Sequence, residues 1–147
     1  ANEFNVEYAV RINGDNLFAD PKIVQSMFLI AETGQWEFIT NVKDRTYPPG
    51  VSVEIVNISL MNDVYHSFTD YDKEHVMPYF YKNLDKTKTY ELKNNEFKVP
   101  AGCHLAIDTM EDYELASQII NSMDKPHWKY DTEKIIQLFQ ANTGIYV

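Results

Sequence analysis

The sequence is poor in several residue types, and each scarcity excludes a class of protein. Its 147 residues include one cysteine, five scattered glycines, and 13 Lys and Arg residues against 22 Asp and Glu. The single cysteine, Cys103, allows neither an internal disulfide nor a cysteine-rich zinc site, and it fits a reducing compartment. The net charge of -9 argues against nucleic acid as a partner, because phosphate backbones attract clustered Lys and Arg.

Long apolar runs and phosphate-loop motifs are also missing. No run approaches the roughly 18 apolar residues of a membrane span, and the opening residues Ala1–Phe4 lack the features of a signal peptide. We therefore expect no membrane association and a cytoplasmic location. The patterns GxGxxG, GxxxxGK[ST] and HExxH do not occur. The apolar content of 44% nevertheless predicts a folded domain, which we expect to be a single one spanning residues 1–147.

Apolar and polar residues alternate in a way that predicts strands and helices in turn. Strands are expected at Val6–Ile12, Trp36–Thr40, Val51–Ile58 and Cys103–Asp108, with a hairpin pairing Tyr90–Lys93 and Glu96–Val99. Helices are expected from Asp20-Pro21 to Gly34, after Ser59, from Asp72 to Tyr81, after Thr109, and from Asp131 or Thr132 to Gly144. Together these elements predict a three-layer α/β fold, with a mixed sheet because of the hairpin.

Two carboxylates share one context. Asp15 follows an apolar run and Asn13-Gly14, and Asp108 ends the run that begins at His104. The carboxyl ends of strands are where α/β sheets bind ligands, and two such acids would suit a hard cation such as Mg²⁺. Each acid also has a structural explanation that stays open. Asp15 suits a turn beside glycine, and Asp108 suits the start of a helix.

Other polar residues are weaker candidates. Asp20 and Asp112 are more typical of helix caps than of ligands. Among the histidines, His75 beside Glu74 is the best functional candidate, although a packed or surface histidine is commoner. The remaining candidates are interpreted as structural, with Cys103 as a buried inert thiol: His66, His104, His127 and the aromatic run Tyr79–Tyr81.

Four segments, in order, resemble motifs of the sugar nucleotidyltransferases. The match is best to the cytidylyltransferases of the spore-coat polysaccharide type, relatives of the CMP-Kdo and CMP-sialic acid synthetases. The segments are Val10–Asn16 with Asp20-Pro21, Arg45–Gly50 with Val53-Glu54, Lys73–Val76 with Pro78-Tyr79, and Ala106–Leu115. Three departures from the family patterns are Asn16-Leu17 for a step into proline, Pro49 for a polar residue, and Lys73 for arginine. The family's opening glycine- and arginine-rich loop, which binds the nucleoside triphosphate, has no counterpart.

The resemblance implies a fold, a reaction and a set of residues. The fold would be the Rossmann-like mixed sheet of the nucleotide-diphospho-sugar transferases, present as its C-terminal two-thirds. The reaction would transfer CMP from CTP to a sugar or sugar acid in surface polysaccharide biosynthesis. Asp15 and Asp108 would be catalytic and would hold Mg²⁺. The residues implied on the substrate side are Arg11, Asn13, Arg45, Tyr47, Gly50, Glu54, Glu74 and His75.

Two functional alternatives stay open. The chain could be part of an active CMP-sugar synthetase, working as a homodimer or with a second chain that supplies the missing N-terminal third. It could instead be a non-catalytic remnant that binds a sugar or a partner. The chain alone is expected to be inactive, because it has no loop to hold three phosphates. Glu54 interrupts an apolar strand, so it is expected either to face water or to meet a ligand or cation.

Overall fold

The computed structural model describes residues 2–147 and is organised around a four-stranded sheet in the order β1-β3-β2-β4. β3 runs antiparallel to both β1 and β2, whereas β2 and β4 are parallel. Three strands therefore point the same way, and their carboxyl ends lie at one end of the sheet. The strands are β1 (Tyr8–Arg11), β2 (Phe38–Thr40), β3 (Glu54–Asn57) and β4 (Thr89–Glu91). The expected mixed sheet is confirmed, although its antiparallel member is β3 and not a hairpin.

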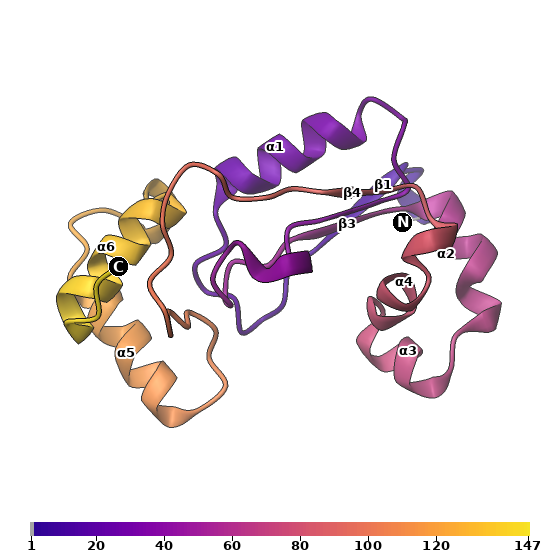
Figure 1. Cartoon of the computed structure of the whole chain (residues 1–147). Helices are drawn as coiled ribbons and strands as arrows, with labels where there is room; N and C mark the ends of the chain where they lie inside the picture. Colours follow the sequence, from indigo (N-terminus) through magenta and orange to yellow (C-terminus); the bar gives the residue numbers. More distant parts are fainter. Residues whose placement is uncertain (1) are drawn as a thin grey trace.

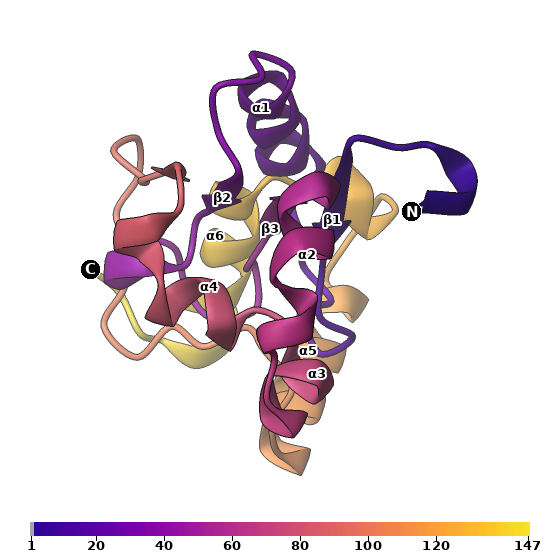
Figure 2. The same ribbon diagram turned by 90° about the vertical axis from the view of Figure 1, so that its right-hand side faces the viewer.

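Helices cover both faces of the sheet, which confirms the predicted α/β layers (Figure 1). The α-helices are α1 (Pro21–Ala31), α2 (Ile58–Val64), α3 (Asp70–His75), α4 (Pro78–Lys82), α5 (Met110–Asn121) and α6 (Thr132–Thr143). Because side chains alternate along a strand, Ile39 and Ile55 meet α1 on one face, while Phe38 and Val56 meet Phe80 of α4 on the other. Figure 2 shows α2, α3 and α4 grouped at one end of the sheet.

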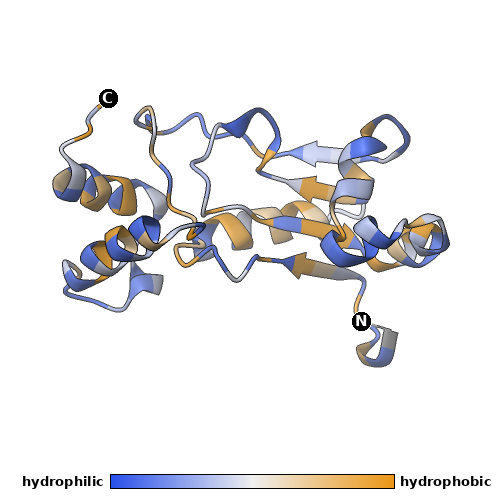
Figure 3. Cartoon of the chain, turned by 90° about the horizontal axis from the view of Figure 1, so that it is seen from below, coloured by the Kyte–Doolittle hydropathy of each residue, from blue (hydrophilic) through white to orange (hydrophobic). Residues whose placement is uncertain are grey.

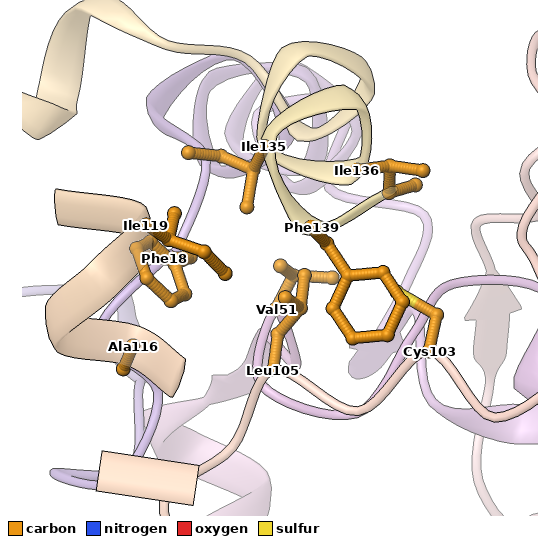
Figure 4. Packing of buried hydrophobic residues seen from close by; sticks show 9 residues of the cluster. All are labelled: Phe18, Val51, Cys103, Leu105, Ala116, Ile119, Ile135, Ile136 and Phe139. Atoms are coloured by element: carbon orange, nitrogen blue, oxygen red, sulfur yellow. The ribbon is translucent and has the colours of Figure 1, made fainter. Parts of the chain in front are cut away.

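A third apolar cluster lies at the opposite end, where α5 and α6 pack together (Figure 4). Ile119 of α5 and Ile135 of α6 are almost completely buried there, together with Val51 and Leu105 from two loops. This cluster fixes the loop that contains Leu105 against the end of the sheet. The longer helices carry both hydrophilic and hydrophobic residues along their length, as expected when one side is buried (Figure 3).

Helix caps are the local features that the sequence predicted best. The Asp20 side chain accepts the backbone N–H of Lys22 at the start of α1, and Thr109 forms a capping box with Asp112 at the start of α5. Asp131 caps α6, which ends at Gly144 in the left-handed conformation. The interpretation of Asp20 and Asp112 as caps is confirmed.

Several predicted elements are wrong. The segment 103–108 is not a strand. Cys103 and Leu105 are buried, but the backbone of this segment bonds to two loops, through Leu105 N–H to Pro49 O and Ile107 N–H to Asp15 O. The apolar residues of segment 103–108 therefore indicate that the segment is buried, and they do not indicate that it pairs with another strand. Asp108 accordingly lies in irregular chain and not at the tip of a strand.

The predicted hairpin is also absent from the described chain, because Asn94 bonds to Thr46 and to the backbone of Phe97 and so forms a loop. The single helix expected over 72–81 is two helices, since Val76 between them has φ +63°. Asn57, and not Ser59, caps α2. Among the described residues, no helix is both long and apolar enough to cross a bilayer.

Candidate functional site

A cavity of about 550 Å³ opens at the carboxyl ends of β1 and β2, next to the start of β3. Its volume lies in the range typical of small-molecule sites. Eight of the ten residues expected from the sequence line it: Arg11, Asn13, Asp15, Arg45, Gly50, Glu54, His75 and Asp108. The place agrees with the rule that α/β sheets bind ligands beyond the carboxyl ends of their strands.

One row of residues crosses the sheet at this end. Arg11, Glu54 and Thr40 lie opposite one another on β1, β3 and β2, so their side chains share one face. The Arg11 guanidinium donates from Nη1 to Glu54 Oε2 at 2.8 Å, and the Glu54 side chain is only 7% exposed. Glu54 therefore meets a cation of the chain itself. A solvated position for Glu54 is excluded.

A tyrosine from α4 completes this row. The Tyr81 hydroxyl donates to Glu54 Oε1 at 2.8 Å and lies 2.7 Å from the Thr40 hydroxyl. Thr40 in turn accepts the backbone N–H of Val42 at 3.0 Å. Burial, and then the charge of Glu54, raise the pKa of Tyr81 well above its ordinary value, so the hydroxyl keeps its proton. Because that proton is used on Glu54, the Thr40 hydroxyl donates to Tyr81.

A second guanidinium reaches the cavity from the loop after β2. Arg45 lines the cavity with φ +49°, and within the described chain no ion pair or hydrogen bond occupies its side chain. Its neighbours are tethered instead. Lys43 pairs with Glu91, and Asp44 accepts from Lys93 at 2.6 Å, which lowers the pKa of Asp44. Adjacent left-handed residues are a costly conformation that is commonest at functional sites.

The two candidate metal-holding acids lie on neighbouring segments. A backbone hydrogen bond of 3.1 Å from Ile107 N–H to Asp15 O places the chain before Asp108 beside Asp15. Among the described residues, Asp15 Oδ1 is the one buried side-chain oxygen or nitrogen without a hydrogen-bond partner. A buried carboxylate oxygen in that state is costly unless a ligand satisfies it. Asp15 and Asp108 therefore offer the hard oxygen donors that Mg²⁺ prefers.

His104 joins the same group, although the sequence suggested only a structural role. Its Nε2 lies 3.0 Å from Asp108 Oδ2, and with Asp112 the three side chains bring ligand atoms within 4.8 Å of one another. The Asp112 oxygen is already used, because it accepts from the Asp108 and Thr109 backbone N–H groups and from the Thr109 hydroxyl. Asp112 is thus a cap, whereas the Asp108 side chain is 61% exposed and open to a ligand.

Gly50 allows the two halves of the cavity wall to meet. It has φ +99°, and a Cβ built on it would lie 2.1 Å from the carbonyl carbon of Leu105 and 2.3 Å from the nitrogen of Ala106. Only glycine permits so close a crossing. The contact brings the segment that carries His104 and Asp108 against the loop that follows Arg45.

Two of the ten expected residues lie elsewhere. Tyr47 lines a second cavity of about 260 Å³ beside the amino ends of α1 and α6, where burial, and then Glu96 and Asp20, raise its pKa. Glu74 is exposed on α3 and does not line the 550 Å³ cavity. A helix turns successive side chains about 100° apart, so the neighbour of His75 points away from it. His75 itself lies against Tyr71, with ring centroids 4.4 Å apart.

Among the lining residues that sequence reasoning did not assign to the site, Tyr81 and His104 contact carboxylates that it did assign. Tyr81 was grouped with core aromatics, and Phe80 beside it is indeed completely buried. The available signal was the polar row itself: Thr40 and Glu54 each interrupt an apolar strand, so a polar partner was to be expected above them. His104 stands four residues before Asp108, but the predicted strand would have separated the two side chains by several residues' rise.

Comparison with known proteins gives consistent results. No family model matches the chain. A solved cytidylyltransferase from Leptospira borgpetersenii superposes with a TM-score of 0.85 at 29% identity, over 97% of this chain and 60% of that one. The spore coat polysaccharide biosynthesis protein SpsF of Bacillus subtilis is 31% identical over 110 residues, 71% of this chain and 43% of that protein. MJ1063 of Methanocaldococcus jannaschii, an uncharacterised protein, is 23% identical over 97% of this chain and 57% of its own length.

These similarities identify the class of the protein as a nucleotidyltransferase fold with its cavity at the strand ends. The resemblance to cytidylyltransferases that the four sequence segments predicted is confirmed by the solved Leptospira structure and by SpsF. It spans about half the length of the curated relatives that it matches.

Proposed function

We propose that the 550 Å³ cavity is the acceptor and metal side of a cytidylyltransferase site, which transfers CMP from CTP to a sugar or sugar acid. The observation that carries this proposal is the convergence of Arg11, Asp15, Arg45 and Asp108 on one cavity, from three separate segments of the chain. The similarity of the chain to a solved cytidylyltransferase supports the reaction type. Balanced, the reaction joins a sugar oxygen to the α-phosphorus of CTP, breaks the bond to the β-phosphate and releases pyrophosphate.

The acidic residues of the cavity would bind a cation, and its basic residues would bind anionic groups of the substrates. Asp15 and Asp108 would hold the divalent cation, and the unsatisfied Asp15 oxygen supports that fit. When bound, Mg²⁺ supplies charge neutralisation for phosphate oxygens. Arg11 and Arg45 would bind a carboxylate or phosphate, since a guanidinium pairs with either in a two-toothed geometry. Asn13 would hydrogen-bond sugar hydroxyls.

Positioning is the main contribution expected of such a site. Phosphoryl-type transfer needs little covalent help from the protein and depends on alignment and charge neutralisation. The arrangement favours rigidity: Glu54 orients Arg11, tethered neighbours flank Arg45, and the Gly50 crossing supports Asp108. The sugar, the choice of CTP, a homodimer and a cytoplasmic location belong to the same proposal and stay predictions.

Metal binding is the most direct test. Mn²⁺ added to the chain should show one tight class of site by electron paramagnetic resonance, and Asp15→Asn and Asp108→Asn should each weaken it by at least about tenfold, as loss of one charged ligand implies. Asp63→Asn is the matched control, because Asp63 is exposed on α2 and does not line the cavity. Equal Mn²⁺ affinity in all three variants would refute the metal assignment.

Turnover then separates the two functional alternatives. Pyrophosphate release from CTP is measured with Mg²⁺ and a panel of sugar acids that includes Kdo and N-acetylneuraminate, and the product is identified by its mass. Activity that Asp15→Asn abolishes and Asp63→Asn leaves intact supports the transferase. Because the chain alone is expected to be inactive, turnover is measured with the N-terminal nucleotide-binding third supplied. Sugar-acid binding without pyrophosphate release under those conditions, with Mn²⁺ bound, supports a binding module that does not catalyse.

A further inference from the structure

The orientation of the Arg11 guanidinium depends on Glu54, its hydrogen-bond partner. Arg11 can keep a fixed orientation toward the cavity provided that the Glu54 carboxylate is itself fixed. Arg11 uses Nη1 on Glu54, and in the described part of the chain its other N–H groups have no partner. The side chain lies at the cavity wall and is 31% exposed. An arginine held at one nitrogen, with the others free toward a cavity, is suited to bind an anion there.

Both carboxylate oxygens of Glu54 accept a hydrogen bond. One donor lies in the sheet and the other in a helix that covers it. Arg11 on the neighbouring strand β1 occupies Oε2, and Tyr81 on α4 occupies Oε1. Because both oxygens already accept hydrogen bonds from the protein, Glu54 is better suited to orient Arg11 than to bind a sugar hydroxyl. The direct sugar contact that the resemblance implied for Glu54 is therefore not the role that its contacts favour.

Tyr81 is immobilised in turn. Its hydroxyl accepts from Thr40, which is completely buried and which accepts the Val42 backbone N–H. The Val42 backbone N–H occupies one acceptor site of the Thr40 hydroxyl. At the other end the Glu54 carboxylate only accepts, so the Tyr81 proton points to Glu54 and the Thr40 proton points to Tyr81. The series therefore fixes the orientation of the Glu54 carboxylate, and this carboxylate in turn fixes the orientation of the Arg11 guanidinium.

We propose that Tyr81 is a positioning residue, whose buried hydroxyl fixes the Glu54 carboxylate so that Arg11 presents its free N–H groups to an anionic group of the acceptor in the cavity. The structural half of the proposal concerns Arg11 alone. The anion-binding half rests on the proposed function, because it takes a sugar acid as the ligand.

Tyr81→Phe removes one hydroxyl and leaves the ring in place. The matched control is Tyr79→Phe in the same helix, because Tyr79 stacks on Phe68 and its hydroxyl has no hydrogen bond among the described residues. Circular dichroism should show both variants folded. Thr40→Val is a second, independent variant that breaks the series one step earlier, should Tyr81→Phe fold poorly.

The first measurement needs no ligand. In ¹⁵N NMR of the arginine side chains, Arg11 should give slowly rotating guanidinium signals in the wild type and in Tyr79→Phe. Tyr81→Phe and Thr40→Val should speed that rotation. Unchanged Arg11 signals in both variants would overturn the positioning role, whatever the protein binds.

The second measurement is calorimetric binding of Kdo or N-acetylneuraminate, with glucose as the neutral control, and Mn²⁺ affinity measured in parallel. Tyr81→Phe should weaken sugar-acid binding by roughly tenfold, as expected when a charge-assisted contact is loosened, and leave Mn²⁺ affinity unchanged. A merely structural role would change both affinities together and would overturn the proposal.

A double-mutant cycle completes the test. If Tyr81 acts through Arg11, Tyr81→Phe should cause no further loss once Arg11 is changed to Ala, whereas independent effects on sugar-acid affinity would contradict the proposal. If the wild type binds no sugar acid but Arg11 loses its slow rotation in Tyr81→Phe, the positioning role stands. In that case the acceptor half of the proposed function fails, and with it the anion-binding half.

Discussion

Gly50→Ala should damage both the fold and the metal site, because Gly50 lies where two loops cross. The added Cβ would stand 2.1 Å from the carbonyl carbon of Leu105, which is 1.3 Å short of an ordinary 3.4 Å contact. The obstructing atoms are backbone, so no side chain can turn aside. Relief requires the two segments to separate, which would break the 2.8 Å hydrogen bond from Leu105 N–H to Pro49 O.

The size of the effect follows from its parts. Forcing an alanine to positive φ costs about 1–2 kcal/mol, and leaving the buried Leu105 amide without a partner costs about 1–3 kcal/mol more. With residual overlap, the loss reaches roughly 3–6 kcal/mol, a large share of the roughly 5–15 kcal/mol that stabilises a domain. Gly102→Ala is the matched control, since Gly102 also has positive φ (+77°) but nothing within 4 Å of the added Cβ.

Urea unfolding followed by circular dichroism measures the two variants side by side. Gly50→Ala should unfold at clearly lower urea than Gly102→Ala, and Mn²⁺ affinity should fall only in the former, because the segment that carries Asp108 is displaced. If the two variants lie within about 1 kcal/mol of each other, the close crossing inferred at Gly50 is wrong.

Three further predictions concern single side chains. Asp20→Ala should cost about 2–4 kcal/mol in urea unfolding, because its buried carboxylate caps α1 and also accepts the N–H and hydroxyl of Thr132. Asp131→Ala removes a cap of α6 and exposed ion pairs with Lys22 and Lys134, so it should cost only about 1–2 kcal/mol, and equal losses would contradict the double role of Asp20. Burial raises the pKa of Cys103 to about 11, so the thiolate forms only as the pH approaches that value. Labelling of Cys103 by Ellman's reagent at about pH 8 should therefore be slow until urea is added. Fast labelling of the folded chain would refute this expectation. In an active enzyme, Glu54→Gln should raise the sugar KM or lower kcat by the equivalent of roughly 1.5–3 kcal/mol while CTP binding stays nearly unchanged, and unchanged kinetics for both substrates would count against any role for Glu54.

The parts of the fold that could be predicted are those with a local physical cause. Asp20-Pro21 and Thr109 with Asp112 start helices because their side chains satisfy free backbone N–H groups nearby. The strand β2 was found because three consecutive residues are buried on both faces. In contrast, Cys103–Asp108 is apolar for a reason that lies elsewhere in the chain: it packs between α5, α6 and the loop of Val51.

Most residues expected at the site line one cavity, although some elements that carry them differ from the prediction. Asp108 was assigned to a strand that does not exist, yet it reaches the expected cavity, because the resemblance concerned residues in order and not their backbone conformation. Glu74 does not line this cavity, for a reason that lies in its helix. The motif contains Glu74 and His75 as consecutive residues. On a helix consecutive side chains point about 100° apart, so only His75 faces the cavity.

The polar row across the strand ends explains why this cavity, and not the second one, is suited to an anionic ligand. In the second cavity the cations are matched by acids: Lys22 pairs with Asp131, and Lys93 with Asp44. In the 550 Å³ cavity, Arg45 has no acidic partner in the described chain, and Arg11 shares Glu54 with Tyr81. Asp15 lines the same cavity, with a buried oxygen that also lacks a partner among the described residues. A cavity that contains both unsatisfied positive and unsatisfied negative groups suits a ligand that carries an anion together with a bound cation, as a sugar acid beside a metal-bound phosphate would.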